Sequence, residues 1–190
     1  MTTALWSRDD LRLNADHIAR WSDELEGSLP GDIVAAVTAR MTGRAVVTCS
    51  FEDAVLAHVA AVAVPGIEIV MIDTQYLFAE TKWFAEEIRR KVDLNLRVVH
   101  PLSVQPDNLW QTDTEACCNV RKVEPLNRLL EGAAVWFTGV RRVDGPTRAN
   151  APIISFDQAR NLLKVNPLAV FTDEDMSTYE TIHELPRNPL

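Results

Sequence analysis

The run Ile67-Glu68-Ile69-Val70-Met71-Ile72-Asp73-Thr74-Gln75-Tyr76 is apolar from Ile67 to Ile72 apart from Glu68, and then turns polar. A short run rich in isoleucine and valine that stops at polar residues is typical of a buried β-strand. Residues 79–92 follow closely and place Trp83, Phe84 and Ile88 on one side, which predicts a helix. A strand followed directly by a helix is the repeating unit of a parallel sheet, so this stretch predicts an α/β fold.

The same alternation continues on both sides of this unit. Further strands are predicted at 45–49, 96–99 and 133–140, and further helices at 8–26, 53–64 and 173–185. Thr172 and Asp175 have the spacing of a helix N-cap at the start of the last helix. Residues 102–113 lack either period and are interpreted as a loop, and Pro125 is expected to kink or interrupt the helix that contains it. The predicted fold is therefore a mostly parallel sheet flanked by helices.

Composition restricts the setting of this fold. The chain has 190 residues, 47% hydrophobic and 24% charged, which suits one globular domain, with residues 1–44 as an N-terminal helical segment before the sheet-bearing part, 45–190. The N-terminus is charged, and no stretch approaches the roughly 18 apolar residues of a membrane span, so we expect a cytoplasmic protein without a membrane partner. Three cysteines, two of them adjacent, agree with a reducing compartment. The net charge of −8 argues against a nucleic-acid partner.

In open α/β sheets, ligands bind beyond the carboxyl ends of the strands, so the residues that close each strand are candidate ligand contacts. After the first strand come Cys49, Ser50 and Asp53. Hydroxyl and backbone N–H groups at a turn that faces a helix N-terminus can cradle an anion. The alternative is a plain turn in which Ser50 caps the helix.

The other strand ends add polar and basic residues. They are Ile72, Asp73 and Thr74 after the second strand, then Thr138, Gly139, Arg141, Arg142 and Arg148 after the fourth. Asp73 could accept a hydrogen bond from a ribose hydroxyl, and the arginines could donate bidentate bonds to phosphate or sulfate oxygens. The alternative is that these arginines are simply solvated.

Adjacent cysteines followed by adjacent cations form a second candidate site. In a helix, Cys117 shares a face with Arg121, and Cys118 shares a face with Lys122. A nearby positive charge favours the thiolate, which is the form that binds metals. The two sulfurs point about 100° apart around a helix, which suits two corners of a cluster better than one zinc ion. The alternative is two small packed residues in an ordinary helix.

Taken together, these segments resemble one family. They are residues 72–81, Cys117-Cys118 with residues 121–126, residues 136–142 and residues 148–152. From about Ala45 to Leu190 the chain resembles the sulfonucleotide reductases, and within them the iron–sulfur adenylyl-sulfate reductases of the phosphoadenylyl-sulfate reductase family.

This resemblance implies an adenine nucleotide α-hydrolase-like fold, with 45–190 as a nucleotide-binding reductase domain that is incomplete at its C-terminus. It implies reduction of adenosine 5′-phosphosulfate to sulfite and AMP, with thioredoxin as the electron donor, and leaves room for a homo-oligomer. The paired cysteines mark members with a [4Fe–4S] cluster, which favour the substrate without a 3′-phosphate. Cys117 and Cys118 would bind the cluster, while Lys122, Arg141, Arg142 and Arg148 would neutralise the phosphosulfate.

Three features depart from the family pattern. Gln75 stands where the family has glycine, and Cys49-Ser50 replaces a serine-rich loop. The sequence stops at Leu190, where the family continues into a Cys-x-x-Cys pair and a Glu-Cys-Gly-Leu-His segment with the nucleophilic cysteine. Two of four cluster ligands and that nucleophile are therefore expected to be missing.

Several interpretations of these departures stay open. The chain is either a fragment of a longer reductase, a truncated nucleotide-binding paralogue, or a regulatory subunit without reductase activity. A 3′-phosphoadenylyl-sulfate reductase is a further alternative. An ATP pyrophosphatase would share the fold, but its Ser-Gly-Gly loop does not occur in this sequence.

Overall fold

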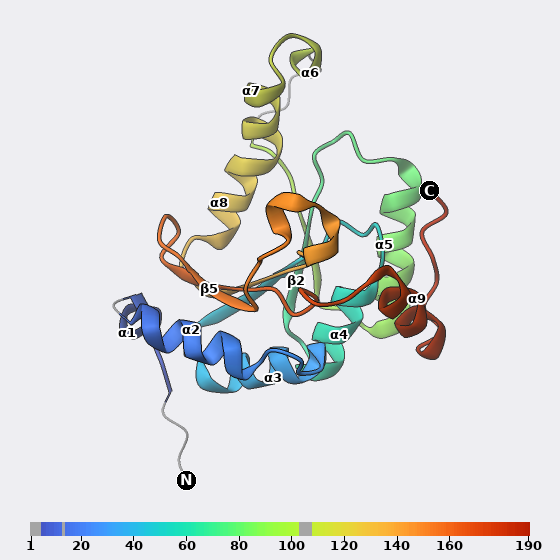
Figure 1. The fold of residues 1–190 in the computed structure, drawn as a ribbon. Coiled ribbons are helices and arrows are strands. Elements are labelled where there is room, and N and C mark those ends of the chain that lie inside the picture. The colour runs from blue at the N-terminus through green and yellow to red at the C-terminus, as the bar shows by residue number, and fades with distance from the viewer. Residues whose placement is uncertain (1–4, 13, 103–107) are drawn as a thin grey trace.

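The computed structural model describes residues 5–12, 14–102 and 108–190 (Figure 1). Its centre is a six-stranded sheet in the order β3-β2-β1-β4-β6-β5. All neighbouring strands are parallel except β5 and β6. The strands are β1 Arg44–Thr48, β2 Glu68–Ile72, β3 Leu96–Val99, β4 Ala133–Thr138, β5 Ile154–Asp157 and β6 Leu162–Val165. The prediction of a mostly parallel sheet flanked by helices is confirmed.

Helices connect and cover the strands. The α-helices are α1 Arg8–Arg12, α2 Ala15–Glu24, α3 Pro30–Arg40, α4 Val55–Ala63, α5 Ala79–Val92, α6 Leu109–Thr112, α7 Thr114–Cys118, α8 Glu124–Leu130 and α9 Asp173–Ile182. The π-helical turn η1 spans Asn119–Val123, and the 3-10 turns η2 and η3 span Arg142–Asp144 and Pro146–Arg148. None of the helices described is long and apolar enough to cross a membrane.

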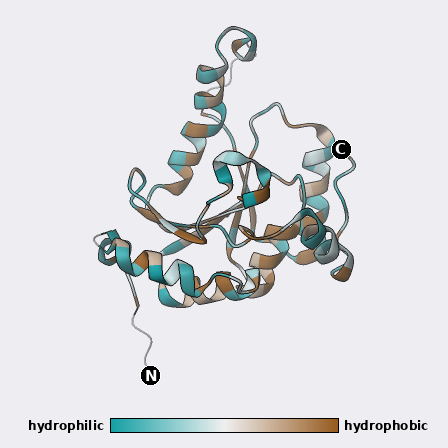
Figure 2. Cartoon of the chain, in the orientation of Figure 1, coloured by the Kyte–Doolittle hydropathy of each residue, from teal (hydrophilic) through white to brown (hydrophobic). Residues whose placement is uncertain are grey.

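The two faces of the sheet are covered unequally. On one face, strand residues such as Val47, Met71 and Phe137 pack in a large core with residues of α2 to α5. On the other face, Val46 and Val70 pack in a smaller core to which α8 contributes its leucines. Figure 2 shows hydrophobic and hydrophilic residues alternating along α2 and α3, which is typical of helices with one buried face.

The helices α6, α7 and α8 form an arm that rises from the sheet (Figure 1). The expected disturbance at Pro125 takes the form of the π-helical turn η1, directly before α8. Proline lacks an N–H group and its ring crowds the carbonyl four residues earlier, so a wider turn lets the chain continue. Cys117 and Cys118 close α7 and therefore lie at the start of this irregular segment.

The carboxyl ends of the parallel strands meet at one edge of the sheet. The chain runs from β1 to β2 and β3 on one side, then crosses to β4 on the other side of β1. Thr48 and Thr138 are register partners at the ends of β1 and β4. This is the topological switch point, where open α/β sheets bind their ligands.

Several element predictions need correction. One helix is predicted at 8–26, but the chain forms α1 and α2, because Asn14 caps α2 by accepting a hydrogen bond from the His17 backbone N–H. Leu13, within the predicted range, lies outside the described residues. The loop predicted at 102–113 contains α6, and residues 103–107 of it lie outside the described part. Helix α3 lies in the N-terminal helical segment predicted at 1–44 but has no predicted range of its own, and strands β5 and β6 have no counterpart among the predictions. Helix α9 begins as predicted, with Thr172 and Asp175 forming the capping box.

Candidate functional site

The turn after β1 lies at the switch point, and two hydrogen bonds fix its shape. The Cys49 N–H donates to the Val70 carbonyl (3.0 Å), and the Asp53 carboxylate accepts from the Val55 N–H (2.8 Å) at the start of α4. Ser50 is exposed, so Asp53 rather than Ser50 provides the side-chain hydrogen bond at this helix start. Phe51 is buried and adopts a left-handed φ of 60°. The Ser50 hydroxyl remains accessible for an anion.

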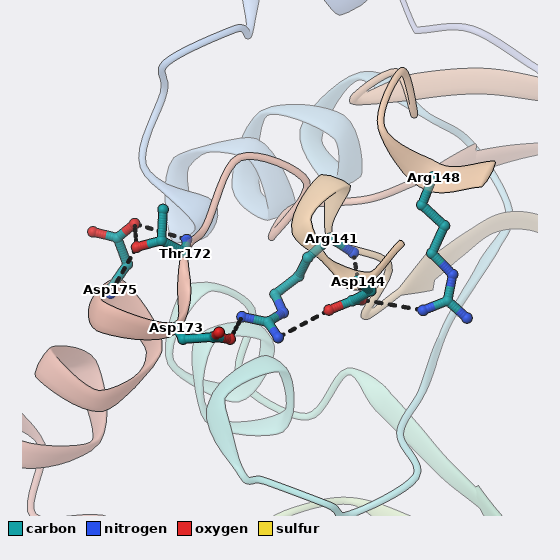
Figure 3. Close-up of polar contacts among 6 residues, drawn as sticks. All are labelled: Arg141, Asp144, Arg148, Thr172, Asp173 and Asp175. Atoms are coloured by element: carbon teal, nitrogen blue, oxygen red, sulfur yellow. Dashed lines mark hydrogen bonds and ion pairs between the residues drawn. The ribbon is translucent and has the colours of Figure 1, made fainter. Parts of the chain in front are cut away.

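An ionic cluster lies beside this turn, after β4. Arg141 contacts Asp144 and Asp173 at 2.9 Å each, while Asp144 also accepts from Arg148 at 3.2 Å. Figure 3 shows Arg141 between the two carboxylates and Arg148 on the far side of Asp144. Asp173 belongs to the first turn of α9, so this cluster joins the end of β4 to the C-terminal helix.

A hollow of about 350 Å³ opens next to this cluster. Its size is at the lower end of the range for small-molecule sites. Its lining comes from the β1–α4 turn, from the end of β4, from α9 and from the residues after α9. The lining residues are Glu52, Asp53, Arg141, Asp173, Met176, Ser177, Glu180, Arg187 and Asn188.

Both arginines that line this hollow are paired with carboxylates. Arg187 contacts Glu180 at 3.1 Å, and Asn188 donates from its side-chain amide to the Phe51 carbonyl at 2.8 Å. Burial raises the pKa of Asp53, partly opposed by the hydrogen bond from Val55 and the charge of Arg141. Burial and the Asp53 carboxylate raise the pKa of the Cys49 thiol, which is therefore held neutral. An anion entering here must compete with carboxylates for Arg141.

Two of the residues predicted to contact a ligand at the end of β4, Arg142 and Thr138, make hydrogen bonds within the fold. Arg142 makes a bidentate ion pair with Glu26 (2.5 and 2.9 Å) and donates to the Ala151 carbonyl (2.9 Å), so the structure does not bring it to Arg141 and Arg148. The buried Thr138 hydroxyl lies 2.6 Å from the side-chain oxygen of Asn166. Gly139 is exposed, and a Cβ added at this position would meet only the side chain of Leu56 at ordinary contact distance, which leaves its backbone accessible.

The turn after β2 forms a second group. The buried Asp73 carboxylate accepts from the Gln75 N–H (2.7 Å) and pairs with Lys82 (2.8 Å), and His100 lies 3.7 Å away. Burial acts to raise the pKa of Asp73, but Lys82 and the Gln75 N–H outweigh it and lower the pKa. Asp73 therefore shapes the turn that follows Ile72, and Thr74 presents its carbonyl to Arg121 at 3.0 Å.

The segment α7–η1, here called the cysteine helix, places its cysteines and cations on the faces that their spacing predicts. Cys117 and Arg121 are both buried, while Cys118 and Lys122 are both exposed. Arg121 faces the turn after β2, because it contacts Thr74 there.

These residues satisfy only part of the ligand set of a [4Fe–4S] cluster. Such a cluster takes four thiolates. Cys117 and Cys118 are adjacent and suit two of them, whereas Cys49 closes β1 with a neutral thiol. Within residues 5–12, 14–102 and 108–190, no group of three or more cysteine, histidine or carboxylate side chains could hold a metal ion. The described residues therefore do not fit a complete cluster.

Sequence reasoning missed the residues that neutralise or support the site. Asp144 lies inside the arginine-rich segment and could have been recognised as their counterion. Asp173 is visible in the sequence only as part of a helix cap, and Arg187 and Asn188 lie in a segment without periodicity. Their role depends on contacts between distant segments, which no local pattern shows.

Comparison with known proteins places the fold and then the family. A phosphoadenylyl-sulfate reductase from Candida auris superposes with a TM-score of 0.80 at 20% identity, covering 93% of this chain and 90% of that chain. The U34-tRNA thiolase NcsA from Methanococcus maripaludis superposes with a TM-score of 0.60 at 13% identity, covering 84% of this chain and 64% of that chain. The chain thus shares the α/β fold of these proteins, and the adenine nucleotide α-hydrolase-like fold implied by the resemblance is confirmed.

Sequence similarity is more specific. Residues 44–190 match the phosphoadenosine phosphosulfate reductase domain. Adenosine 5′-phosphosulfate reductases from Mycolicibacterium smegmatis and Mycobacteroides abscessus are 38% and 40% identical, over 93% of this chain and 72% and 71% of their own lengths. The chain belongs to the phosphoadenosine phosphosulfate reductase family.

Proposed function

We propose that this chain forms the nucleotide-binding part of an adenosine 5′-phosphosulfate reductase, which produces sulfite and AMP in assimilatory sulfate reduction. The observation that carries the proposal is the 38–40% identity to adenosine 5′-phosphosulfate reductases over 93% of the chain. The ionic cluster of Arg141 and Arg148 at the switch point supports it, because guanidinium groups suit phosphate and sulfate oxygens.

The reaction requires neutralisation of negative charge. A cysteine thiolate attacks the sulfate sulfur, the bond from that sulfur to the phosphate oxygen breaks, and AMP leaves with the electron pair. A dithiol reductant then supplies two electrons to the thiosulfonate and releases sulfite. Attack of one anion on another is slow unless cations offset the charge, and we assign this task to Arg141, Arg148 and Lys122. Arg142 would support the turn through Glu26.

The remaining strand-end residues would hold the nucleotide. Cys49, Ser50 and Asp53 line or adjoin the phosphate side of the site, together with the accessible backbone of Gly139. The turn formed by Ile72, Asp73 and Thr74 would face the nucleoside, and Thr138 would act through its contact with Asn166. We assign no nucleophile among the three cysteines, since Cys49 is neutral and the other two are the candidate metal ligands.

We propose that Cys117 and Cys118 supply two thiolate ligands of a [4Fe–4S] cluster. Their adjacency and the neighbouring cations support this assignment. The partner that returns electrons would be thioredoxin, in a cytoplasmic setting, and a homo-oligomer is compatible with the proposal. No catalytic step is assigned to the cluster, because the described residues provide half of its ligands.

A second candidate is a nucleotide-binding protein without reductase activity. The observation that favours it is the incomplete set of thiolates among the described residues. The two candidates share a nucleotide site and differ only in product formation. Sulfite release therefore separates them.

The test incubates the protein with adenosine 5′-phosphosulfate and reduced thioredoxin under anaerobic conditions and measures sulfite and AMP. The full-length enzyme should form both in equal amounts. A 3′-phosphate needs donors of its own, and each unpaired group costs about 1–3 kcal/mol, so the 3′-phosphorylated substrate should be about tenfold to a hundredfold poorer. Equal efficiency toward both substrates would refute the assigned specificity. Nucleotide binding without sulfite would favour the second candidate.

A further inference from the structure

The side chain of Arg121 is 5% exposed, although it carries a positive charge. Its Nη1 donates to the Thr74 carbonyl at 3.0 Å, and its guanidinium carbon lies 4.1 Å from the centre of the Tyr76 ring. Desolvating a guanidinium is costly unless other groups replace the lost water. A carbonyl and an aromatic face do so here, and both belong to the same short turn.

That turn has a fixed internal shape. The Asp73 carboxylate accepts from the Gln75 N–H (2.7 Å), and the Thr74 hydroxyl accepts from the Tyr76 N–H (3.3 Å). Gln75 adopts a left-handed φ of 66°, a conformation that non-glycine residues enter at a cost. These bonds define the shape of residues 73–76 but do not locate the turn against the helix that carries Cys117.

We propose that Arg121 is a positioning residue that fixes the turn 73–76 against the cysteine helix. The residue lies four positions after Cys117, on the same buried side, so its contacts tie the end of β2 to the segment α7–η1. Only a planar guanidinium can stack on Tyr76 and donate to Thr74 in one arrangement, since lysine offers a point charge without a flat face. The role in nucleotide binding rests on the proposed function, because it requires that this turn contacts the nucleotide.

The experiment compares wild type with Arg121→Lys, Tyr76→Leu and the double variant. Arg90→Lys is the matched control, because Arg90 is an exposed arginine on α5 and its ion pair with Glu86 is long, at 3.5 Å. Hydrogen exchange is measured by mass spectrometry on peptides covering 73–77 and 114–121. Binding of AMP is measured by calorimetry, and the thermal midpoint reports global stability.

We expect Arg121→Lys to speed exchange in both peptides, with a thermal midpoint within a few degrees of wild type, and to weaken AMP binding about fivefold to tenfold. Tyr76→Leu should have a smaller effect in the same direction, and the double variant should be little worse than Arg121→Lys alone, because the stacking contact is already lost in the lysine variant. Unchanged exchange in residues 73–77, or fully additive effects, would overturn the inference. If wild type itself fails to bind AMP, the proposed function fails, while the exchange data still decide the role of Arg121.

Discussion

The guanidinium of Arg141 and the carboxylate of Asp173 lie 2.9 Å apart and join the end of β4 to the first turn of α9. Asp173 is highly exposed, whereas Arg141 is largely covered. The carboxylate therefore occupies a face of Arg141 that an anionic ligand would need. We expect a phosphosulfate that binds at this edge to compete with Asp173 for Arg141.

Replacing Asp173 with asparagine should strengthen AMP binding about threefold, because an exposed ion pair that competes with the ligand is removed. Glu174→Gln is the control, since Glu174 lies in the same helical turn and also carries an exposed negative charge. Calorimetry at constant ionic strength provides the measurement. Weaker binding by Asp173→Asn than by Glu174→Gln would show that Asp173 supports the ligand instead of competing with it.

Gln75→Gly should raise the free energy of unfolding by about 0.5–1 kcal/mol, because glycine adopts a positive φ without the steric cost that glutamine bears. Gln111→Gly in α6 should lower the free energy of unfolding, since a glycine inside a helix is unfavourable. Urea unfolding with matched slopes measures both. A loss of stability in Gln75→Gly would mean that the side chain of Gln75 contributes more than its backbone conformation costs.

The pH dependence of stability should report on His58. Its ring lies 2.8 Å from the Tyr179 hydroxyl through Nδ1 and 4.8 Å from the His183 ring, and this cluster joins α4 to α9. Burial lowers the pKa of His58, with help from His183 and Lys91, while burial raises the pKa of Tyr179 to about 12. The folded state thus resists protonation of His58, so this contribution is complete above the ordinary pKa of about 6.5 and is lost as pH falls through the lower folded value.

Thermal midpoints measured between pH 8 and pH 5 test this sign. Wild type should lose stability on acidification below about pH 6.5 more steeply than His58→Gln, and the two proteins should run parallel at higher pH. Identical slopes across the whole range would assign the acid sensitivity to other groups.

The paired cysteines can be tested by iron content. In a reductase that carries all four cluster ligands, Cys117→Ser or Cys118→Ser should abolish the brown absorbance and the sulfite production, because each removes a thiolate ligand. Cys49→Ser serves as the control for iron content, since its thiol is held neutral at the end of β1. The 190-residue chain should hold less than one cluster per chain. A full complement in the monomeric 190-residue chain, or retention of iron and activity in both serine variants, would contradict the assignment.

The sequence predicts those parts of the fold whose signals are local. The strand β2 and its polar end at Asp73 follow from one apolar run, and the start of α9 follows from the capping residues Thr172 and Asp175. Strands β5 and β6 have four residues each and depend on pairing with each other and with β4, which no local pattern shows. Helix α3 does carry a signal in Pro30 and the apolar residues 33, 34 and 37, but its moderate amphipathic pattern is easily overlooked.

The site was predictable in residue type more than in geometry. The arginine-rich segment after β4 indicates an anion site, but nothing local distinguishes Arg141 from Arg142. Their directions are decided by Asp173 and Glu26, which lie 32 and 116 residues away. The same limit applies to Arg121, whose contacts are with the turn at Thr74 and Tyr76, and Thr74 lies 47 residues away in the sequence.

Titration of the 190-residue protein with adenosine 5′-phosphosulfate tests the central claim most directly. Calorimetry at low and high salt, on wild type and Arg141→Gln, should show saturable binding at one site per chain, weakened by salt because the contacts are ionic. The Arg141→Gln variant should bind at least about tenfold more weakly, since a charge-assisted contact is lost. No detectable binding by folded wild-type protein at millimolar ligand would contradict the assignment of this fold edge as a sulfonucleotide site.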